Sequence, residues 1–141
     1  MTTTDPELLS VKMRRASLLK KKLELVKAFG LAYYKPHPGQ DAFHHAGIRF
    51  KRRMIRTGNR WGKSISGCAE DCAWMTGERP WYPESDPARR GGIPQHPVKM
   101  LTITTDWDKV DEIFTTQVGE GGKVWKFLPK GFIKSTKRNH S

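Results

Sequence analysis

One short stretch, residues 57–64, limits what this chain can fold into more than any other. It reads Thr57-Gly58-Asn59-Arg60-Trp61-Gly62-Lys63-Ser64. A Gly-Lys-Ser ending is typical of loops whose backbone N–H groups hold phosphate oxygens, with the lysine as a mobile charge and the serine hydroxyl on a phosphate-bound Mg²⁺. Such a loop joins a strand to a helix N-terminus, where anions are favoured. The stretch therefore predicts a strand, a loop and a helix in that order.

The sequence on both sides of the loop agrees with this order. Residues 50–55 can form a short strand, and residues 63–75 have helical spacing and end at Gly77. Residues 98–105 are β-branched and apolar, as expected of a second strand, and a helical pattern through Val110, Ile113, Phe114 and Gln117 follows. This rhythm predicts an α/β fold, with a parallel sheet flanked by helices. The alternative is a polar turn that opens a helix and leaves Lys63 solvated.

An N-terminal helix is expected ahead of this region, over residues 1–30. Asp5-Pro6-Glu7 reads as a helix start, apolar residues recur at helical spacing, and Gly30 is expected to end the helix. Lys20-Lys21-Lys22 lies off the apolar positions, as a solvated face or a contact to nucleic acid. Pro38 can open a second, short helix. Residues 78–97, rich in Pro, Gly and charge, are expected to form a long loop.

The formal net charge of +12 suits a polyanionic partner, most simply nucleic acid. A solvated basic surface is the alternative, and a membrane surface is a weaker one. The basic run Arg49–Arg56 can form a lip around a triphosphate or contact a DNA backbone. Cys68 and Cys72 read as small buried hydrophobes, and the five histidines read as surface or loop residues. Without a secretory signal or a membrane-length apolar run, we expect a cytoplasmic protein.

Two segments together resemble the large terminase subunit of tailed bacteriophages, the ATPase that packages DNA into a procapsid. Pro38-Gly39-Gln40-Asp41-Ala42-Phe43 resembles the adenine-recognition segment of that family. Residues 56–64 resemble its variant phosphate loop, in which an arginine, here Arg60, shortly precedes Gly-Lys-Ser. The variant loop accommodates Thr57, which stands where the general motif has glycine.

The resemblance implies ATP and Mg²⁺ as cofactors and duplex DNA as the substrate of translocation. Gln40 would read adenine, Ser64 would bind Mg²⁺, and Arg60 and Lys63 would act on the transferred phosphoryl group. The nucleotide-binding residues it implies are Gln40, Thr57, Gly58, Asn59, Arg60, Trp61, Gly62, Lys63 and Ser64. It also implies a portal protein and a small terminase subunit as partners, a homo-oligomeric ring for the full-length protein, and a bacterial host cell.

On this resemblance, residues 31–141 correspond to the N-terminal part of a P-loop ATPase domain. The family's apolar strand ending in Asp-Glu and its nuclease domain do not appear before Ser141, so we expect this chain to be a fragment. Asp111-Glu112 has helical surroundings and does not take the place of that acidic pair. We therefore expect ATPase activity of the full-length protein, and this chain alone to lack the acidic pair. The alternatives are a helicase-type P-loop ATPase and a non-catalytic basic nucleic-acid-binding protein.

Overall fold

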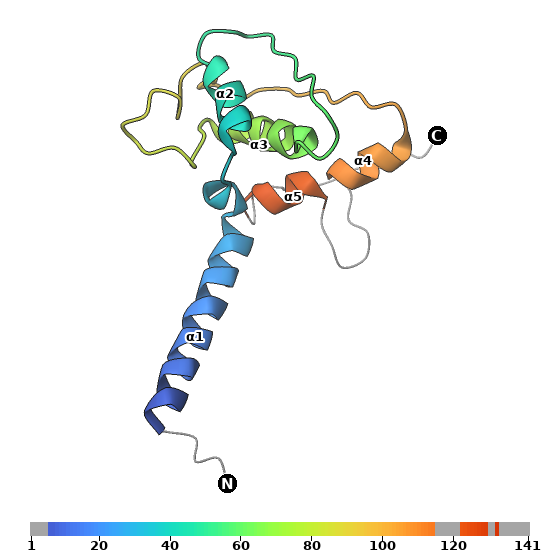
Figure 1. Ribbon diagram of the computed structural model, residues 1–141. Helices are drawn as coiled ribbons and strands as arrows, with labels where there is room; N and C mark the ends of the chain where they lie inside the picture. Colours follow the sequence, from blue (N-terminus) through green and yellow to red (C-terminus); the bar gives the residue numbers. More distant parts are fainter. Residues whose placement is uncertain (1–5, 115–121, 130–131, 133–141) are drawn as a thin grey trace.

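The computed structural model describes residues 6–114, 122–129 and 132, and the described backbone is helical (Figure 1). Its elements follow in the order α1 (Pro6–Ala28), the 3-10 helix η1 (Gly30–Tyr33), α2 (Pro38–Ala46), α3 (Lys63–Thr76), α4 (Trp107–Phe114) and α5 (Lys123–Phe127). Long connections without regular structure join α2 to α3 and α3 to α4. Helix α3 lies at the centre, with α2, α5 and the long connections around it (Figure 1).

The predicted parallel sheet is wrong, because the described residues contain no β-strand. A strand needs a neighbour for its backbone N–H and C=O groups, and neither predicted strand has one. In residues 50–56, Arg53 turns toward the helices and donates to the backbone of Phe43 and to Glu70, so side-chain contacts hold this segment. Residues 98–104 leave Leu101 and Ile103 84% and 83% exposed. An α/β phosphate-loop fold is therefore excluded for the described residues.

Helix α3 supplies one face of the apolar core, as predicted from its spacing. Its buried Cys68, Ala69 and Cys72 pack with Leu31 of η1 and with Val124 and Leu128 in and after α5. Burial raises the pKa of the Cys68 thiol to about 11, so this thiol stays protonated at neutral pH. The prediction that both cysteines act as small hydrophobes is confirmed, since both are free and buried. Gly77 ends the helix in a left-handed conformation, as predicted.

Helix α5 packs on the core face of α3, and α4 packs on α5. Helices α4 and α5 are joined to each other by an ion pair between Lys123 and Glu112 and by the Trp125 indole N–H, which donates to the carbonyl of Phe114. Glu112 lies in α4, so the Asp-Glu pair belongs to a helix, as predicted. Gln117, the last residue of the predicted helical pattern, lies outside the described residues.

Helix α1 projects from this body as a single long rod (Figure 1). Its sequence is rich in Leu, Lys, Arg, Met and Ala, which are strong helix formers, and this explains a helix without tertiary support. The predicted N-terminal helix is confirmed over Pro6–Ala28, whereas its expected cap, Asp5, lies outside the described residues. None of the described helices combines the length and the apolarity needed to cross a bilayer.

Candidate functional site

The loop before α3 is closed by the side chain of Lys63. Its ammonium donates to the carbonyl oxygens of Thr57 at 3.0 Å and of Gly58 at 2.8 Å. These two bonds hold the start of the loop over the first residue of the helix. A lysine ammonium has three N–H donors, so one remains for an anion at this point. The lysine of the motif is therefore placed at the head of α3 and directed back over its own loop.

The head of α3 has the backbone geometry of an anion site. Gly62 is the N-cap with φ of 86°, and because it has no side chain it cannot satisfy the first N–H groups of the helix. Arg60 also has a positive φ, 64°, which is uncommon outside glycine. Ser64 is exposed in the first helical turn. The helix N-terminus, the Lys63 ammonium and the Ser64 hydroxyl together form a donor set that suits phosphate oxygens.

Helix α2 (Pro38–Ala46) and its N-cap contact this loop. His37, the N-cap of α2, contacts the carbonyl of Trp61 through Nε2 at 3.0 Å and accepts from Gly39 N–H through Nδ1 at 3.1 Å. These two bonds require a proton on Nε2 and none on Nδ1, which is one neutral tautomer. The ring of His37 also packs edge-on against the Trp61 indole at 4.8 Å between centroids. The loop is thus held to α2 by side chains, where a P-loop fold would use a sheet.

Gln40 lies beside the loop, as the sequence predicts, but its amide is turned toward the backbone. Its Nε2 lies 3.4 Å from the carbonyl oxygens of Trp61 and Gly62. Its Oε1 accepts from His37 N–H at 3.0 Å and completes a capping box on α2. Only 6% of Gln40 is exposed. The adenine role of Gln40 stays a prediction, and the contacts present here position the loop.

A cavity of about 420 Å³ opens between α2 and the segment that leads into the loop. Gly39 and Phe43 line one side, Arg52 and Arg56 line the other, and Thr57 and Trp61 lie at its loop end. The cavity therefore adjoins the loop at Thr57 and Trp61. It offers aromatic rings and cationic side chains next to residues 57–64, which suits a flat, polar ring system.

The structure brings some of the predicted residues together and leaves others apart. The Lys63 side chain contacts the backbone carbonyls of Thr57 and Gly58. The Gln40 amide contacts the backbone carbonyls of Trp61 and Gly62. Asn59 and Arg60 are exposed on the loop, and the predicted catalytic role of Arg60 stays a prediction. Among the described residues, no group of three or more His, Cys, Asp or Glu side chains could hold a metal ion by itself. A Mg²⁺ ion at Ser64 would depend on the phosphates for its other ligands.

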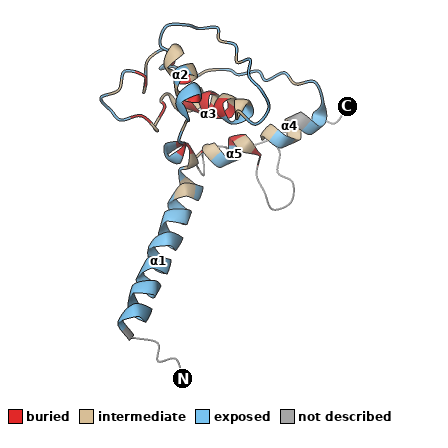
Figure 2. Cartoon of the chain, in the orientation of Figure 1, coloured by how far each residue is buried: buried red, intermediate tan, exposed pale blue. Residues whose placement is uncertain are grey.

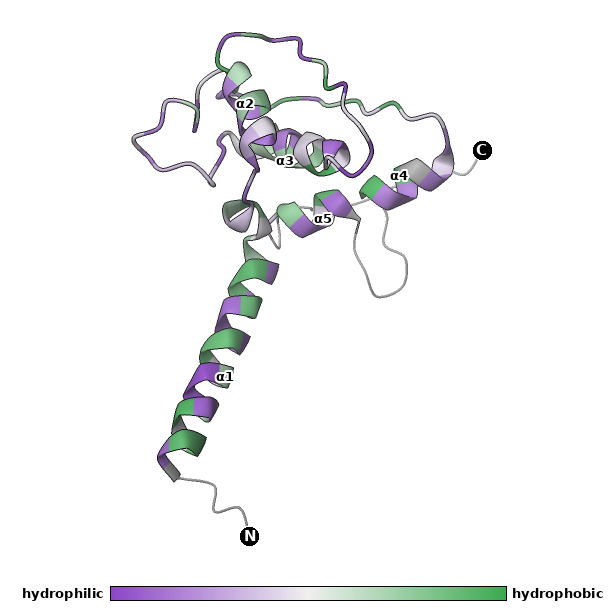
Figure 3. Ribbon diagram, viewed as in Figure 1, coloured by the Kyte–Doolittle hydropathy of each residue, from purple (hydrophilic) through white to green (hydrophobic). Residues whose placement is uncertain are grey.

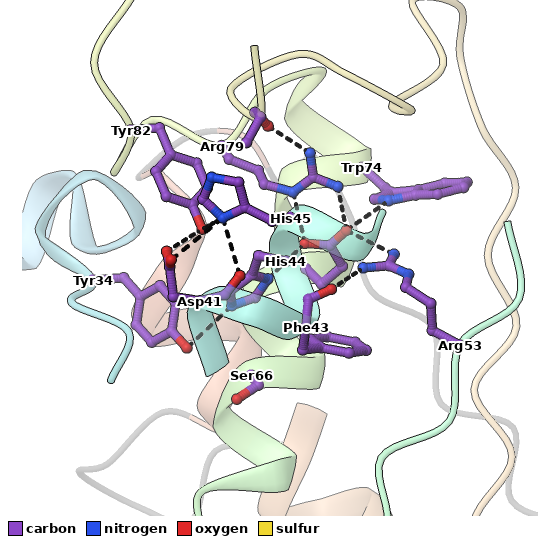
Figure 4. A network of polar contacts seen from close by, with 12 residues as sticks. Tyr34, Asp41, Phe43, His44, His45, Arg53, Ser66, Trp74, Arg79 and Tyr82 are labelled. Atoms are coloured by element: carbon purple, nitrogen blue, oxygen red, sulfur yellow. Dashed lines mark hydrogen bonds and ion pairs between the residues drawn. The ribbon is translucent and has the colours of Figure 1, made fainter. Parts of the chain in front are cut away.

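A second polar cluster is centred on the buried Glu70 of α3. Figure 4 shows the residues around it, among them His44, Arg53 and Arg79. The Glu70 carboxylate accepts from Arg79 twice, from Arg53 at 2.8 Å and from the Trp74 indole N–H at 3.3 Å. His44 lies 2.8 Å from the same carboxylate through Nδ1 and contacts the Tyr34 hydroxyl through Nε2 at 3.2 Å. This buried charge is therefore surrounded by cationic and neutral donors.

The donors around Glu70 outweigh the cost of its burial. Burial alone raises the pKa of this carboxyl group, but the hydrogen bonds from Arg79, His44 and Arg53 and the charge of Arg79 together lower the pKa well below its ordinary range. Glu70 is therefore ionised at neutral pH. We assign this cluster a structural role, because every one of its polar side chains is engaged by another residue of the chain.

Arg79 and Tyr82 attach the long connection between α3 and α4 to the helices. Arg79 is fully buried and also donates from Nη1 to the carbonyls of Ala88 at 2.6 Å and Gly91 at 2.9 Å. The Tyr82 hydroxyl donates to Asp41 of α2 at 2.6 Å. The predicted long loop is confirmed, since residues 78–97 contain neither helix nor strand. Its backbone is nevertheless fixed at several points.

Sequence reasoning missed four residues that hold these clusters together: His37, His44, Glu70 and Arg79. The prediction that the histidines are surface or loop residues is wrong for His44, which is fully buried. Its imidazole is accommodated there because both ring nitrogens have partners. One signal was available for Glu70: this acidic residue occurs in a helix among small residues, Ser66, Ala69 and Ala73, which allow close approach of long side chains. Arg79 carried no comparable signal.

The comparisons with known proteins add no relative. The chain matches no protein-family model, no curated protein and no solved structure.

Proposed function

We propose that this chain binds the phosphate groups of a nucleotide at the loop formed by residues 57–64. One observation carries the proposal: the Lys63 ammonium lies over its own loop at the head of α3, bonded to the carbonyls of Thr57 and Gly58. A bound phosphate would take the remaining N–H of this ammonium and the backbone N–H groups at the start of the helix. The Ser64 hydroxyl is exposed beside them. The proposal depends on this loop alone and requires no sheet.

The donor set and the adjoining cavity favour a nucleoside triphosphate over a simple phosphate. The cavity of about 420 Å³ lies at the Thr57 and Trp61 end of the loop, where a base attached to bound phosphates could reach. Bound Mg²⁺ would neutralise phosphate charge, with Ser64 as its protein ligand. Lys63 and the first turn of α3 hold the phosphates, and His37 holds the loop in place through Trp61. The resemblance supports ATP as the nucleotide.

The wider role that the resemblance supports is nucleotide binding within a viral DNA-packaging motor. In that role the motor would couple ATP hydrolysis to the translocation of duplex DNA, with the portal protein and the small terminase subunit as partners. Our proposal for this chain is limited to binding, because binding is the step that the contacts of Lys63 and the exposed Ser64 support.

The test compares Lys63→Ala with the parent chain in titrations of a fluorescent ATP analogue with Mg²⁺. Loss of a charge-assisted hydrogen bond costs about 1.5–3 kcal/mol, so we expect affinity to fall about 10- to 100-fold. Lys21→Ala is the matched control, because it removes the same charge from an exposed position on α1, outside both the loop and the basic run Arg49–Arg56. Its affinity should stay within about twofold of the parent, given the small effect of a distant screened charge.

Competition with inorganic triphosphate separates the phosphate contacts from the base contacts. Triphosphate should displace the analogue from the parent chain, whereas adenosine alone should displace it poorly. Equal affinity of the parent and Lys63→Ala for the analogue would remove the loop as the phosphate site. Displacement by adenosine but not by triphosphate would instead assign the affinity to the cavity.

A second function, binding of nucleic acid without catalysis, is favoured by the exposed basic side chains between α2 and the loop. Arg49, Lys51, Arg52 and Arg56 are exposed, while Arg53 of the same run is engaged with Glu70. Contacts of such side chains to phosphates give binding that falls steeply with salt. This function would show salt-dependent binding of duplex DNA that neither ATP nor Lys63→Ala changes. Nucleotide-dependent DNA binding would favour the first proposal.

A further inference from the structure

Helix α1 carries a large apolar surface that the rest of the described chain does not cover. Eight apolar side chains of this helix are between 40% and 67% exposed: Leu8, Leu9, Val11, Met13, Leu18, Leu19, Leu23 and Leu25. Figure 2 shows α1 as exposed along almost its whole length, and Figure 3 shows hydrophobic and hydrophilic residues alternating along it. An uncovered apolar surface of this extent marks an interaction site in a soluble protein.

Part of this surface has the spacing of a helix-pairing seam. Leu9, Ala16 and Leu23 recur every seven residues, and Leu19 and Val26 each follow one of them by three. This is the a and d spacing of a coiled coil, in which the apolar residues of two helices interlock. Lys12 follows Leu9 by three residues and puts a charge at an expected apolar position of the seam. The uninterrupted part of the seam therefore runs over residues 16–26.

Basic side chains flank the seam on both sides. Arg15 and Lys22 occupy the g positions, and Lys20 and Lys27 occupy the e positions. In a parallel pair of two copies, each g residue would face an e residue, and in an antiparallel pair g would face g and e would face e. Every such contact would join two cations. The flanking charges therefore disfavour pairing of α1 with a second copy of itself and favour a partner with acidic flanks.

Nucleic acid and an anionic bilayer each match only part of this surface. Nucleic acid would contact the lysines and arginines but would leave the leucines exposed. An anionic bilayer takes both kinds of side chain only when they occupy separate faces of the helix. On α1 they do not, because a second apolar row, Val11, Leu18 and Leu25, lies on another side with Arg15 and Lys22 between the two rows. A partner helix with an apolar seam and acidic flanks matches both the leucines and the cations.

We propose that α1 is a docking helix for an acidic amphipathic helix of another protein. The partner's apolar residues would pack on Leu19, Leu23 and Val26, and its Asp or Glu side chains would face Arg15, Lys20, Lys22 and Lys27. This surface lies apart from the loop of residues 57–64 and is independent of nucleotide binding.

The test titrates the full chain against a labelled synthetic helix of four heptads with Leu at a and d and Glu at e and g. A matched peptide has Lys in place of each Glu. Fluorescence anisotropy should show saturable binding of the Glu peptide, at least tenfold tighter than that of the Lys peptide at low salt. High salt should reduce the ratio of the two affinities, because exposed charge pairs are screened.

Two variants assign the binding to α1. Charge reversal of the flanks (Arg15→Glu, Lys20→Glu, Lys22→Glu and Lys27→Glu) should exchange the preference, so that the Lys peptide binds more tightly. The seam variant Leu19→Lys with Leu23→Lys keeps the positive charge and should abolish binding of the Glu peptide. Circular dichroism checks that both variants keep their helix content. Lys63→Ala should bind the Glu peptide as the parent does, even if nucleotide binding is lost.

Four results would overturn the proposal. They are equal binding of the two peptides, retained binding by the seam variant, tighter binding of duplex DNA or anionic vesicles that requires α1, and concentration-dependent dimerisation through α1 in sedimentation.

Discussion

Glu70 and Arg79 face each other through both oxygens of the carboxylate: Arg79 Nε donates to Oε2 at 2.9 Å and Nη2 donates to Oε1 at 2.5 Å. Both side chains are buried, and the remaining nitrogen of Arg79 bonds two carbonyls of the long connection after α3. One guanidinium thus joins the central helix to a connection without regular structure. This buried charge pair is one of the contacts that fix the connection, beside the bond from Tyr82 to Asp41.

Replacing Arg79 with methionine should destabilise the protein by about 3–5 kcal/mol, because it leaves the Glu70 charge buried with fewer partners. Arg90→Met is the matched control. Arg90 is an exposed arginine that pairs with Glu78 and Glu84, and such surface pairs contribute about 0–1 kcal/mol. Urea denaturation of the parent and the two variants gives the comparison. Similar losses of unfolding free energy in both variants would show that the buried pair stabilises the protein no more than the exposed pairs do.

The stability of the protein should fall in acid because of Glu70. Its pKa is lowered in the folded state, since the bonds from Arg79, His44 and Arg53 outweigh the effect of burial. A lowered pKa gives stability that is fully present above the unfolded value, about 4.3, and is lost as the pH falls toward the folded value. Free energies of unfolding measured from pH 6 to pH 3 should therefore decrease.

Glu70→Gln is the variant that assigns this acid sensitivity. It should be less stable than the parent at pH 6, because a neutral amide replaces a charge beside two arginines, and its stability should change less between pH 5 and pH 3. Parallel pH profiles of the parent and the variant would place the acid-sensitive group elsewhere.

A side chain should be destabilising at Gly62, the N-cap of α3, and accepted at Gly67 inside that helix. Gly62 has φ of 86°, and an added Cβ would lie 2.6 Å from Nε2 of Gln40. Gly62→Ala should cost about 1–2 kcal/mol for the left-handed backbone and should weaken nucleotide binding. At Gly67 a Cβ would meet nothing within 4 Å, so Gly67→Ala should stabilise α3 by up to about 1 kcal/mol. Thermal denaturation measures both, and destabilisation by Gly67→Ala would contradict this account.

The elements that the sequence predicts correctly are those with local signals. Helix α2 begins at Pro38 and α3 ends before Gly77, as expected, because proline at a helix start and glycine after a helix end act through their own backbone. The sheet was predicted from segments that look like strands one at a time. A strand forms only when the backbone of a second segment hydrogen-bonds to it, and the apolar spacing within one segment does not show whether such a partner exists.

The residues of the candidate site likewise fall into two groups, those that a local sequence pattern predicts and those that it does not. The Gly-Lys-Ser ending places Lys63 at a helix start from local pattern alone, and the structure agrees. The pairing of Glu70 with Arg79, and the contact of His37 with Trp61, join residues across loops whose paths no local pattern fixes. Arg79 looked like one of many solvated cations, because burial of an arginine depends on partners that the rest of the fold supplies.

Gln40 offers the test that separates adenine recognition from positioning of the loop. Its amide contacts Trp61, Gly62 and His37, so removal in Gln40→Ala should loosen the loop. We expect affinities for ATP, GTP and inorganic triphosphate to fall together by about 2- to 10-fold, the effect of losing about one neutral hydrogen bond. Competition titrations against one fluorescent analogue give all three values. A relaxed preference for ATP over GTP, with triphosphate binding unchanged, would instead place the Gln40 amide at the base, as the resemblance implies.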